Sequence, residues 1–334
     1  MSIILIIVLF LFGMWFLANR WNRPQNGRLA VVDGDVCKAA GDDITITTWN
    51  IGFAALGAKA DLFIDGGQNM RALPRRDIEL AANTIADRLA ELQSDIVLLQ
   101  EDARVSFLTR GVKVHDVIAQ KLRGYSRCFW ADFRTLWVPE PLKFDHGVSI
   151  FSRLMPMSTT ALTTPQDPLY YYGFLKKYYG GIVQKYPRSG QGDWVVINIH
   201  LSAFDEAARQ SQLTALFMYA AAEHQAGNDV VIGGDWNMRL STKEFAHDGQ
   251  YKDTHTIFDL PMDALPKGWR VAKDDSSATL RSMNKPYVKG QNYTSVVDGF
   301  VVSPNVRIKA VKTHDLGFEH TDHHPVTAAF GIAH

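Results

Sequence analysis

Short apolar runs rich in β-branched residues alternate with helix-like segments from Ile44 to the end of the chain, and this alternation constrains the fold most strongly. No internal repeat at a fixed short period accompanies it. Strands that interleave with helices throughout predict a single α/β domain over residues 44–332. The predicted strands are 44–50, 95–101, 147–153, 194–202, 229–237, 295–303 and 325–332.

Two segments between these strands show helical spacing. Pro74 is placed to open the first of them in its first turn. The second runs from Ala207 to Ala222. Each segment repeats its apolar residues every three or four positions, which is typical of a helix with one buried face. The core-facing residues are expected to be Ile78, Ala82, Ile85, Leu89 and Leu92 in the first helix, and Leu213, Leu216, Phe217 and Ala220 in the second.

An uncharged apolar run from Ile3 to Ala18 precedes this domain. As a helix its 16 residues span ~24 Å, a little less than the ~30 Å hydrocarbon core of a bilayer. The run indicates an N-terminal transmembrane anchor over residues 1–19. The alternatives are a buried core helix and a signal peptide, although no positive charge precedes the run and no small-residue cleavage site follows it.

Three arginines follow the apolar run: Arg20, Arg23 and Arg28. By the positive-inside rule they predict a single-pass membrane protein whose catalytic domain lies on the cytoplasmic face. Residues 20–43 mix Pro, Gly, Asn and charge without steady periodicity, which is typical of a linker.

The composition excludes several classes of protein. The 334 residues are 46% hydrophobic, which argues against a mostly disordered chain. Lys and Arg number 35, as do Asp and Glu, so the basic excess of a generic polyanion binder is missing. The two cysteines, Cys37 and Cys128, lie far apart and in no Cys-x-x-Cys motif, which argues against a disulfide framework and a cysteine zinc site.

Polar residues stand at the ends of most predicted strands. A carboxylate at the end of an apolar strand is costly to bury unless it is paired or bound to a metal, so this many polar ends indicate one shared site. Asp235 and Asn237 are two residues apart and point to the same face of an extended backbone. The glycines before them allow a substrate or an opposing chain to come close. The polar ends are Asn50, Glu101, His200, Asp235, Asn237, Asp298, Asp322 and His323.

These side chains suggest a reaction. Carboxylate and amide oxygens are hard ligands that suit Mg²⁺ or Mn²⁺. His200 and His323 can transfer protons beside such an ion. A hard cation with His and Asp residues is the equipment for hydrolysing a phosphate ester by attack of water.

Seven motifs in this order resemble the endonuclease/exonuclease/phosphatase superfamily over about residues 44–332. The superfamily includes DNase I-like nucleases, abasic-site endonucleases, neutral sphingomyelinases and inositol-polyphosphate phosphatases. The resemblance implies a four-layer α/β/β/α sandwich of two mixed β-sheets flanked by helices, with the site at one edge of the sheets. The motifs are TTWNIG, LLQED, HGVSIFSR, INIHLSAF, GGDWNM, VVDGFVVS and TDHHPV.

The resemblance also implies roles for the residues. Asn50 and Glu101 are expected to bind a Mg²⁺ ion, or Mn²⁺, with Asp322 close to the same ion. No other cofactor is expected. The ion and these residues would support in-line attack of water without a covalent enzyme intermediate. The implied catalytic residues are Asp235 for the water, Asn237 for the phosphate or water, His323 paired with Asp298, and His200 as general acid or phosphate binder.

Each of these residues also has a purely structural interpretation. Asn50, Asp235 with Asn237, and Asp298 could belong to turns. Glu101 could be an exposed strand end, and His200 a hydrogen-bonded core histidine. The histidines at 314, 320, 323 and 324 could suggest zinc, but their spacing fits no common zinc motif. His146, directly before a predicted strand, is a further candidate to line the cleft.

Two segments bear on the substrate. Pro168–Val183 holds five Tyr and two Lys, and is either a buried hairpin or an aromatic, basic lip that enters a membrane interface. Ser277–Gly290 carries Arg281, Lys285 and Lys289, and either clamps a phosphate head group or is an ordinary loop.

Together these features favour a membrane-anchored, metal-dependent phosphodiesterase that cleaves a phospholipid or sphingolipid head group, as a sphingomyelinase does. The alternatives are a DNA or RNA nuclease, an inositol-type phosphatase and an inactive scaffold. The expected partners are a lipid bilayer and a phosphate-ester substrate, with lipid favoured over nucleic acid and no protein partner inferred.

Overall fold

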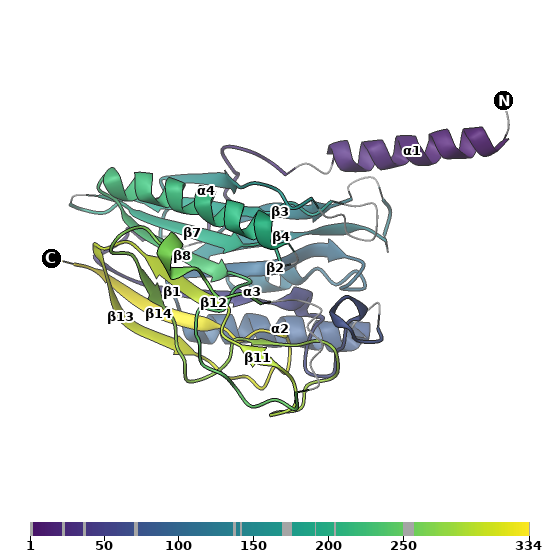
Figure 1. Ribbon diagram of the computed structural model, residues 1–334. Helices are drawn as coiled ribbons and strands as arrows, with labels where there is room; N and C mark the ends of the chain where they lie inside the picture. Colours follow the sequence, from purple (N-terminus) through teal and green to yellow (C-terminus); the bar gives the residue numbers. More distant parts are fainter. Residues whose placement is uncertain are drawn as a thin grey trace.

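The computed structural model describes residues 3–21, 24–35, 38–69, 73–135, 138–140, 142–168, 176–190, 192–203, 205–249 and 257–333, with the side chains of 18–21 and 64 left out. Within these residues two six-stranded sheets pack against each other (Figure 1). The first has the strand order β13-β14-β1-β2-β4-β3, and the second β5-β6-β7-β8-β12-β9. Each sheet is mixed, because β1 pairs with β2, and β7 with β8, in parallel while the other neighbours are antiparallel.

The strands of the first sheet are β1 (Asp43–Asn50), β2 (Ile96–Ser106), β3 (Ser126–Arg134), β4 (Phe144–Ser152), β13 (Val306–Thr313) and β14 (Val326–Ile332). Those of the second sheet are β5 (Ser158–Thr163), β6 (Gly180–Tyr186), β7 (Trp194–His200), β8 (Asp229–Asp235), β9 (Arg270–Ala272) and β12 (Asp298–Val302). A short separate ribbon pairs β10 (Leu280–Arg281) with β11 (Thr294–Ser295). The helices are α1 (Ile3–Trp21), α2 (Arg75–Leu92), α3 (Val114–Lys121) and α4 (Glu206–Gln225), with single 3-10 turns at Gly52–Ala54, Phe63–Asp65 and Met262–Ala264.

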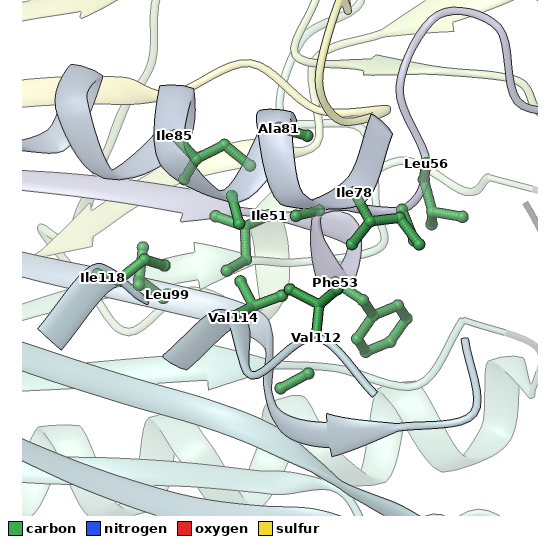
Figure 2. Close-up of a cluster of buried hydrophobic side chains, with 14 of the residues drawn as sticks. Ile51, Phe53, Leu56, Ile78, Ala81, Ile85, Leu99, Val112, Val114 and Ile118 are labelled. Atoms are coloured by element: carbon green, nitrogen blue, oxygen red, sulfur yellow. The ribbon is translucent and has the colours of Figure 1, made fainter. Parts of the chain in front are cut away.

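Three apolar cores separate four layers. One core lies between the sheets, where Leu98 of the first sheet and Phe300 of the second belong to the same cluster. A second joins α2 and α3 to the outer face of the first sheet (Figure 2). The third joins α4 to the outer face of the second sheet. The predicted two-sheet α/β core is therefore confirmed, with α4 on one side and α2 and α3 on the other (Figure 1).

The helical spacing read from the sequence corresponds to buried faces. In α2, which begins directly after Pro74, the side chains of Ile78, Ala82, Ile85 and Leu89 are buried, as predicted, whereas Leu92 in the last turn is only partly buried. In α4 the buried residues include Leu213, Leu216, Phe217 and Ala220, also as predicted. The side chain of Asp205 caps α4 by accepting a hydrogen bond from the Ala208 backbone N–H.

The glycines before Asp235 serve the contact between the sheets. A Cβ at Gly233 would lie 2.6 Å from the Phe300 ring and 2.8 Å from a methyl group of Leu98. Of the two explanations offered by the sequence, close approach of an opposing chain is therefore the one seen at this position. The close packing holds β8 against β2, and so holds the ends of the two sheets together.

The predicted transmembrane anchor over residues 1–19 is wrong. Among the described residues, no helix combines the length and the apolar character needed to cross a membrane. The physical reason lies in α1: its apolar run ends at Ala18 and is followed by Asn19 and Arg20, so only ~24 Å of helix is apolar. The predicted single-pass membrane location loses its support with the anchor, and so does the cytoplasmic orientation drawn from Arg20, Arg23 and Arg28.

Residues 24–35 and 38–42 run along the sandwich instead of through open solvent. Isolated bridges join Arg28 to Thr160 and Lys38 to Leu154, and the side chains of Leu29 and Ala40 are buried. Cys37 lies outside the described residues, and Cys128 is a buried free thiol.

Candidate active site

Strand pairing brings the polar strand ends to one edge of the sandwich. Asn50 ends β1, His200 ends β7 and Asp235 ends β8. His200 stands beside Asp235 in the parallel register of β7 and β8, and Asp298 stands opposite Asp235 in the antiparallel register of β8 and β12. Residues that are far apart in sequence therefore meet because their strands end together.

Glu101 reaches this edge through an irregularity in β2. The pairing of β2 with β4 shifts register between Leu99 and Asp102, and Glu101 has a φ of 52°. A left-handed residue at a bulge turns its side chain away from the regular alternation. The Glu101 carboxylate consequently lies 4.0 Å from His200 Nε2.

Asp235 is the centre of the cluster. Its Oδ2 accepts a hydrogen bond of 2.9 Å from Asn50 Nδ2 and lies 3.7 Å from His200 Nε2 and 3.8 Å from His323 Nε2. Its Oδ1 accepts a hydrogen bond from the backbone N–H of Asn237. These contacts fix the direction of the carboxylate and link both predicted histidines to it.

Asp298 and His323 form a buried pair. Asp298 Oδ2 lies 2.8 Å from His323 Nδ1, so the other ring nitrogen, Nε2, faces Asp235. The backbone N–H of Asp298 donates to the Thr279 hydroxyl, and the Trp49 indole donates to the carbonyl of His323. The ring is therefore held from both sides.

Asp322 sits against the turn that follows β1. Its Oδ1 accepts a hydrogen bond from the Thr321 hydroxyl, which also contacts the Asn50 carbonyl. Gly52, at a φ of 50°, leaves room for the carboxylate, since a Cβ there would lie 2.7 Å from Asp322 Oδ1. This is one position where only glycine fits both the backbone and the space.

A cavity of about 610 Å³ opens on the cluster. Seven of the eight predicted site residues line it, and the eighth, Asp298, lies behind His323 as its hydrogen-bond partner. The rest of the wall is mainly apolar and aromatic. Its apolar side chains include Phe53, Leu56, Leu62, Phe63, Leu108, Phe133, Phe144 and Met283.

The two histidines differ in charge. Burial lowers the pKa of His200 well below 6.5, and the positive charges of Lys177 and His323 add to this effect. Burial also opposes charge on His323, but the carboxylates of Asp298 and Asp235 outweigh it and raise its pKa to about 10. Near neutral pH, His200 is a neutral imidazole and His323 an imidazolium.

Two acids of the site have raised pKa values. Burial raises the pKa of Glu101 to about 8, with Asp322 and Asp235 adding to the rise while Lys177 and His323 oppose it. Burial likewise raises the pKa of Asp322. Crowded, buried carboxylates of this kind favour either protonation or a bound cation.

The donor set fits a divalent metal ion. The predicted ligands Asn50, Glu101 and Asp322 all line the cavity and offer hard oxygen atoms. The ligand atoms of Asp235, Asp298 and His323 also lie within 4.8 Å of one another, and Asp298 Oδ1 is buried without a hydrogen-bond partner among the described residues. The geometry thus offers a second possible set of ligands beside the predicted one.

Sequence reasoning missed several features of the site. Lys177, in the segment expected to form either a buried hairpin or an interfacial lip, is buried and lines the cavity. Asp132 Oδ2 lies 3.9 Å from its ammonium. Asp132 also lies 3.3 Å from Nδ1 of His146, which lines the cavity as the sequence suggested. A carboxylate inside the aromatic run CFWADFR was the one signal available for Asp132, because such a residue needs a buried partner.

Two other suggestions of the sequence change in the structure. Of the proposed lip, Tyr170, Tyr171 and Tyr172 lie outside the described residues, while Tyr179 is buried. Arg281 is buried too, and its terminal nitrogens donate to the carbonyls of 56, 57, 60, 282 and 285. Arg281 therefore holds the cavity wall together through its terminal nitrogens, whereas its Nε has no hydrogen-bond partner among the described residues.

The histidines near the C-terminus have separate roles. His314 Nε2 contacts the Thr327 hydroxyl, and His324 stacks on Phe318 with ring centres 3.8 Å apart. His324 Nδ1 contacts the carbonyl of Ala278, and Nε2 accepts from the backbone N–H of Phe318, so both nitrogens are occupied. The alternative of a zinc site built from these histidines gains no support from this arrangement.

Comparison with solved structures shows the same fold. An endonuclease/exonuclease/phosphatase protein from Beutenbergia cavernae matches with a TM-score of 0.56 and 17% identity, covering 87% of this chain and 72% of that one. A protein of the same family from Leptotrichia buccalis matches with a TM-score of 0.56 and 13% identity, covering 86% of this chain and 100% of that one. TDP2 of D. rerio, complexed with a single strand DNA product, matches with a TM-score of 0.52 and 13% identity, covering 86% of this chain and 99% of that one. No curated protein matches the chain.

A family model covers the whole of the site. It is described as the Endonuclease/Exonuclease/phosphatase family and matches residues 47–323, which include all eight predicted site residues. The family is hydrolytic, includes phosphodiesterases and is generally dependent on divalent metals. The chain belongs to the endonuclease/exonuclease/phosphatase family.

Proposed function

We propose that this protein is a divalent-metal-dependent phosphodiesterase whose substrate carries an apolar group beside the scissile phosphate, with a phospholipid or sphingolipid as the favoured class. The observation that carries the proposal is the form of the cavity. Its polar end holds Glu101, Asp235 and His323, and the rest of its wall is largely apolar. Such a wall gains free energy by covering hydrocarbon, at roughly 25 cal/mol per Å².

The catalytic end can divide the work of hydrolysis among its residues. Asp235, oriented by Asn50 and by the N–H of Asn237, would orient the attacking water and take its proton. His323, protonated and held by Asp298, would donate a proton to the leaving oxygen. His200, held neutral, would hydrogen-bond the phosphate without adding charge.

Asn50, Glu101 and Asp322 would hold the metal ion, with Mg²⁺ and Mn²⁺ as the candidates for this oxygen-rich set. When bound, the ion would offset negative charge on the phosphate oxygens. The chain's own contribution is to fix these oxygens at the ends of different strands before the substrate arrives.

The exposed Phe63 offers a specific test of the lipid substrate. It lines the mouth of the cavity yet is 65% exposed, so Phe63→Ser is expected to leave the fold intact. We expect this variant to lower hydrolysis of sphingomyelin or phosphatidylcholine vesicles roughly tenfold. Turnover of the soluble diester p-nitrophenyl phosphorylcholine should change little.

The matched control is Met218→Ser, since Met218 is similarly exposed but lies on α4, away from the cavity. Both activities of the wild type should disappear with EDTA and return with Mg²⁺ or Mn²⁺. Equal loss on vesicles and on the soluble ester in Phe63→Ser would count against the lipid substrate. Absence of EDTA-sensitive hydrolysis of either substrate would overturn the proposed function as a whole.

A nuclease is the second candidate. The D. rerio TDP2 structure with a single strand DNA product shares the fold, and aromatic residues such as Phe53 and Phe133 offer surfaces on which bases could stack. The zero net charge of the chain counts against this candidate. Plasmid and single-stranded DNA assayed beside the vesicles distinguish the two, because a nuclease would hydrolyse DNA at the faster rate.

A further inference from the structure

We propose that Lys177 binds a non-bridging oxygen of the substrate phosphate, and that Asp132 is the positioning residue that holds Lys177 at the cavity wall. The proposal rests on the proposed function, because it assigns a residue to the phosphate of that substrate. It concerns a side chain that no sequence motif singles out as part of the site.

The charges of the cavity wall create the need for such a residue. Three carboxylates, those of Glu101, Asp235 and Asp322, line the cavity, and a phosphate diester carries a negative charge of its own. Like charges in a poorly solvated site repel one another strongly. A permanent positive charge at the cavity wall, in addition to the metal ion and the His323 imidazolium, would therefore help to hold a substrate phosphate beside these acids.

Among the described lining residues, two side chains carry a permanent positive charge: Lys177 and Arg281. The guanidinium of Arg281 already donates to a ring of backbone carbonyls, including those of Leu56 and Gly57. Its position is fixed by the loop that it supports. Lys177, by contrast, is the lining cation whose charge acts on Glu101 and His200, so it lies close to the residues that would meet the phosphate.

Lys177 is held in place without being sealed off. Its side chain is only 8% exposed, and its ammonium lies 3.9 Å from Asp132 Oδ2 and 5.3 Å from the centre of the Tyr179 ring. At 3.9 Å the ammonium and the carboxylate attract each other but are longer apart than a charge-assisted hydrogen bond.

Asp132 belongs to a bulge in β3. The pairing of β3 with β4 shifts register between Ala131 and Phe133, and Asp132 is buried at this irregularity. The next residue, Phe133, lines the cavity and stacks on the ring of His146, which Asp132 also contacts. One short stretch of β3 therefore supplies both the anchor of the cation and part of the apolar wall.

This arrangement defines a binding position for the phosphate. Asn50, His200 and Asp235 lie at the ends of β1, β7 and β8, while Lys177 lies just before β6, the strand next to β7. A phosphate between them would have Lys177 on one side and the apolar substituent beside Phe133. The same binding position would accept any phosphate diester, whether its substituents come from a lipid or from a nucleotide.

The test measures phosphate binding and turnover separately. Inorganic phosphate is titrated calorimetrically into the wild type, Lys177→Met, Lys177→Arg and the control Lys176→Met. Lys176 is the neighbouring lysine and is not one of the cavity-lining residues. We expect Lys177→Met to bind phosphate roughly 10- to 100-fold more weakly, because a hydrogen bond to a charged group is lost. Lys177→Arg should retain most of the affinity and Lys176→Met all of it.

Kinetics on bis-p-nitrophenyl phosphate should show a raised KM for Lys177→Met with a smaller change in kcat, since the contact is made in both the ground state and the transition state. Asp132→Asn should shift KM in the same direction. Mn²⁺ affinity provides an independent readout: it should rise in Lys177→Met, because a cation beside Glu101 and Asp235 is removed.

Two soluble diesters identify the source of the phosphate. p-Nitrophenyl phosphorylcholine represents a lipid head group, and thymidine 5′-p-nitrophenyl phosphate represents a nucleotide. The KM for both should rise in Lys177→Met if the lysine binds their shared phosphate. Phosphate affinity in Lys177→Met equal to that of the wild type, with a normal melting temperature, would overturn the inference even if the protein is a phosphodiesterase. Conversely, loss of phosphate affinity in Lys177→Met alone would support it even if the lipid substrate is wrong.

Discussion

Two Asp–His pairs in this molecule have almost the same local geometry but different surroundings. Asp298 Oδ2 lies 2.8 Å from His323 Nδ1, and Asp102 Oδ2 lies 2.6 Å from His115 Nδ1. All four side chains are buried. The second nitrogen of His323 faces Asp235 across the cavity, whereas the ring of His115 packs against Phe129 and Phe151.

The difference shows that a buried Asp–His pair is not by itself a catalytic device. The pair of His115 joins α3 to the first sheet, and Ser149 Oγ of β4 donates a second hydrogen bond to the same Asp102 oxygen. The pair of His323 can use its charge because the free nitrogen opens on a site where a substrate could lie. The same kind of Asp–His pair thus stabilises the core in one place and takes part in the proposed catalysis in the other.

The largest expected effect distinguishes the two pairs directly. His323→Phe should lower kcat for bis-p-nitrophenyl phosphate roughly 1,000-fold, because the proton donor is lost. His115→Phe should leave kcat of the folded protein within a few fold. Steady-state kinetics with both variants at one temperature makes the comparison. A comparable loss of kcat in both variants would show that the division between core and site is wrong.

Unfolding in urea should show a similar loss of stability in both variants. His115→Phe leaves the carboxylate of Asp102 buried with the Ser149 hydroxyl as its remaining partner, and we expect the free energy of unfolding to fall by about 3 kcal/mol. His323→Phe also strands a buried carboxylate, so its stability should fall by a similar amount. The two variants would then agree in stability and differ in kcat. A stable His115→Phe protein would contradict the cohesive role of this pair.

The charge of His323 predicts a pH dependence of stability in the metal-free protein. Its pKa is about 10 in the folded state and close to 6.5 when unfolded, so the folded state binds the extra proton between these values. Stability from this pair is complete below pH 6.5 and falls as pH rises toward 10. With EDTA present, the wild type should lose about 2 kcal/mol more than His323→Phe between pH 7.5 and 9. Parallel pH profiles for the two proteins would argue against a charged His323.

Gly52 supports the edge that carries His323. Gly52→Ala places a Cβ against Asp322 Oδ1 and Thr321 Oγ1 at a positive φ, and we expect a loss of about 1 kcal/mol in stability. Mn²⁺ affinity should fall as well, because the Asp322 carboxylate must move. Gly124→Ala is the control, since a Cβ there meets nothing within 4 Å and the residue lies far along the chain from this turn. Unchanged Mn²⁺ affinity in Gly52→Ala would remove Asp322 from the ligand set.

The smallest effect concerns the core alone. Burial raises the pKa of Cys128 to about 12, so its reactive thiolate is scarce at pH 8. In a Cys37→Ser background, a thiol reagent should modify Cys128 only after guanidinium is added. Rapid modification of the native protein would indicate that this core opens as readily as the edge.

The site was predictable from the sequence wherever a polar residue ends an apolar strand. Asn50, Glu101 and Asp235 stand out because each lies at or near the end of a predicted apolar strand, and His323 because it lies just before one. A buried strand end has few other reasons to be polar. The structure brings them to one cavity, while their individual roles stay predictions. The seven predicted strands all correspond to strands, within a few residues at their ends.

What the sequence did not reveal depends on contacts between distant segments. Lys177 sits in an aromatic stretch that resembles an interfacial lip. Its ammonium lies beside Asp132 because β6 packs against β3 of the other sheet, where the Tyr178 N–H donates to the Asp132 carbonyl. The bulges at Glu101 and Asp132 leave no mark in the apolar pattern, because a bulge changes direction and not composition. The transmembrane prediction for α1 failed for a simpler reason. The run is apolar, but it is too short to cross a membrane.

Because β1 and β2 belong to one sheet and β7, β8 and β12 to the other, neither sheet alone carries all the proposed catalytic residues. A chain cut between β4 and β5 gives a second fragment that carries the whole second sheet together with β13 and β14 of the first. Such a chain should recover hydrolysis only when both fragments are mixed and reassociate. Recovered hydrolysis would then report that the two fragments have assembled. At Gly233 the two sheets must pack closely for this to happen.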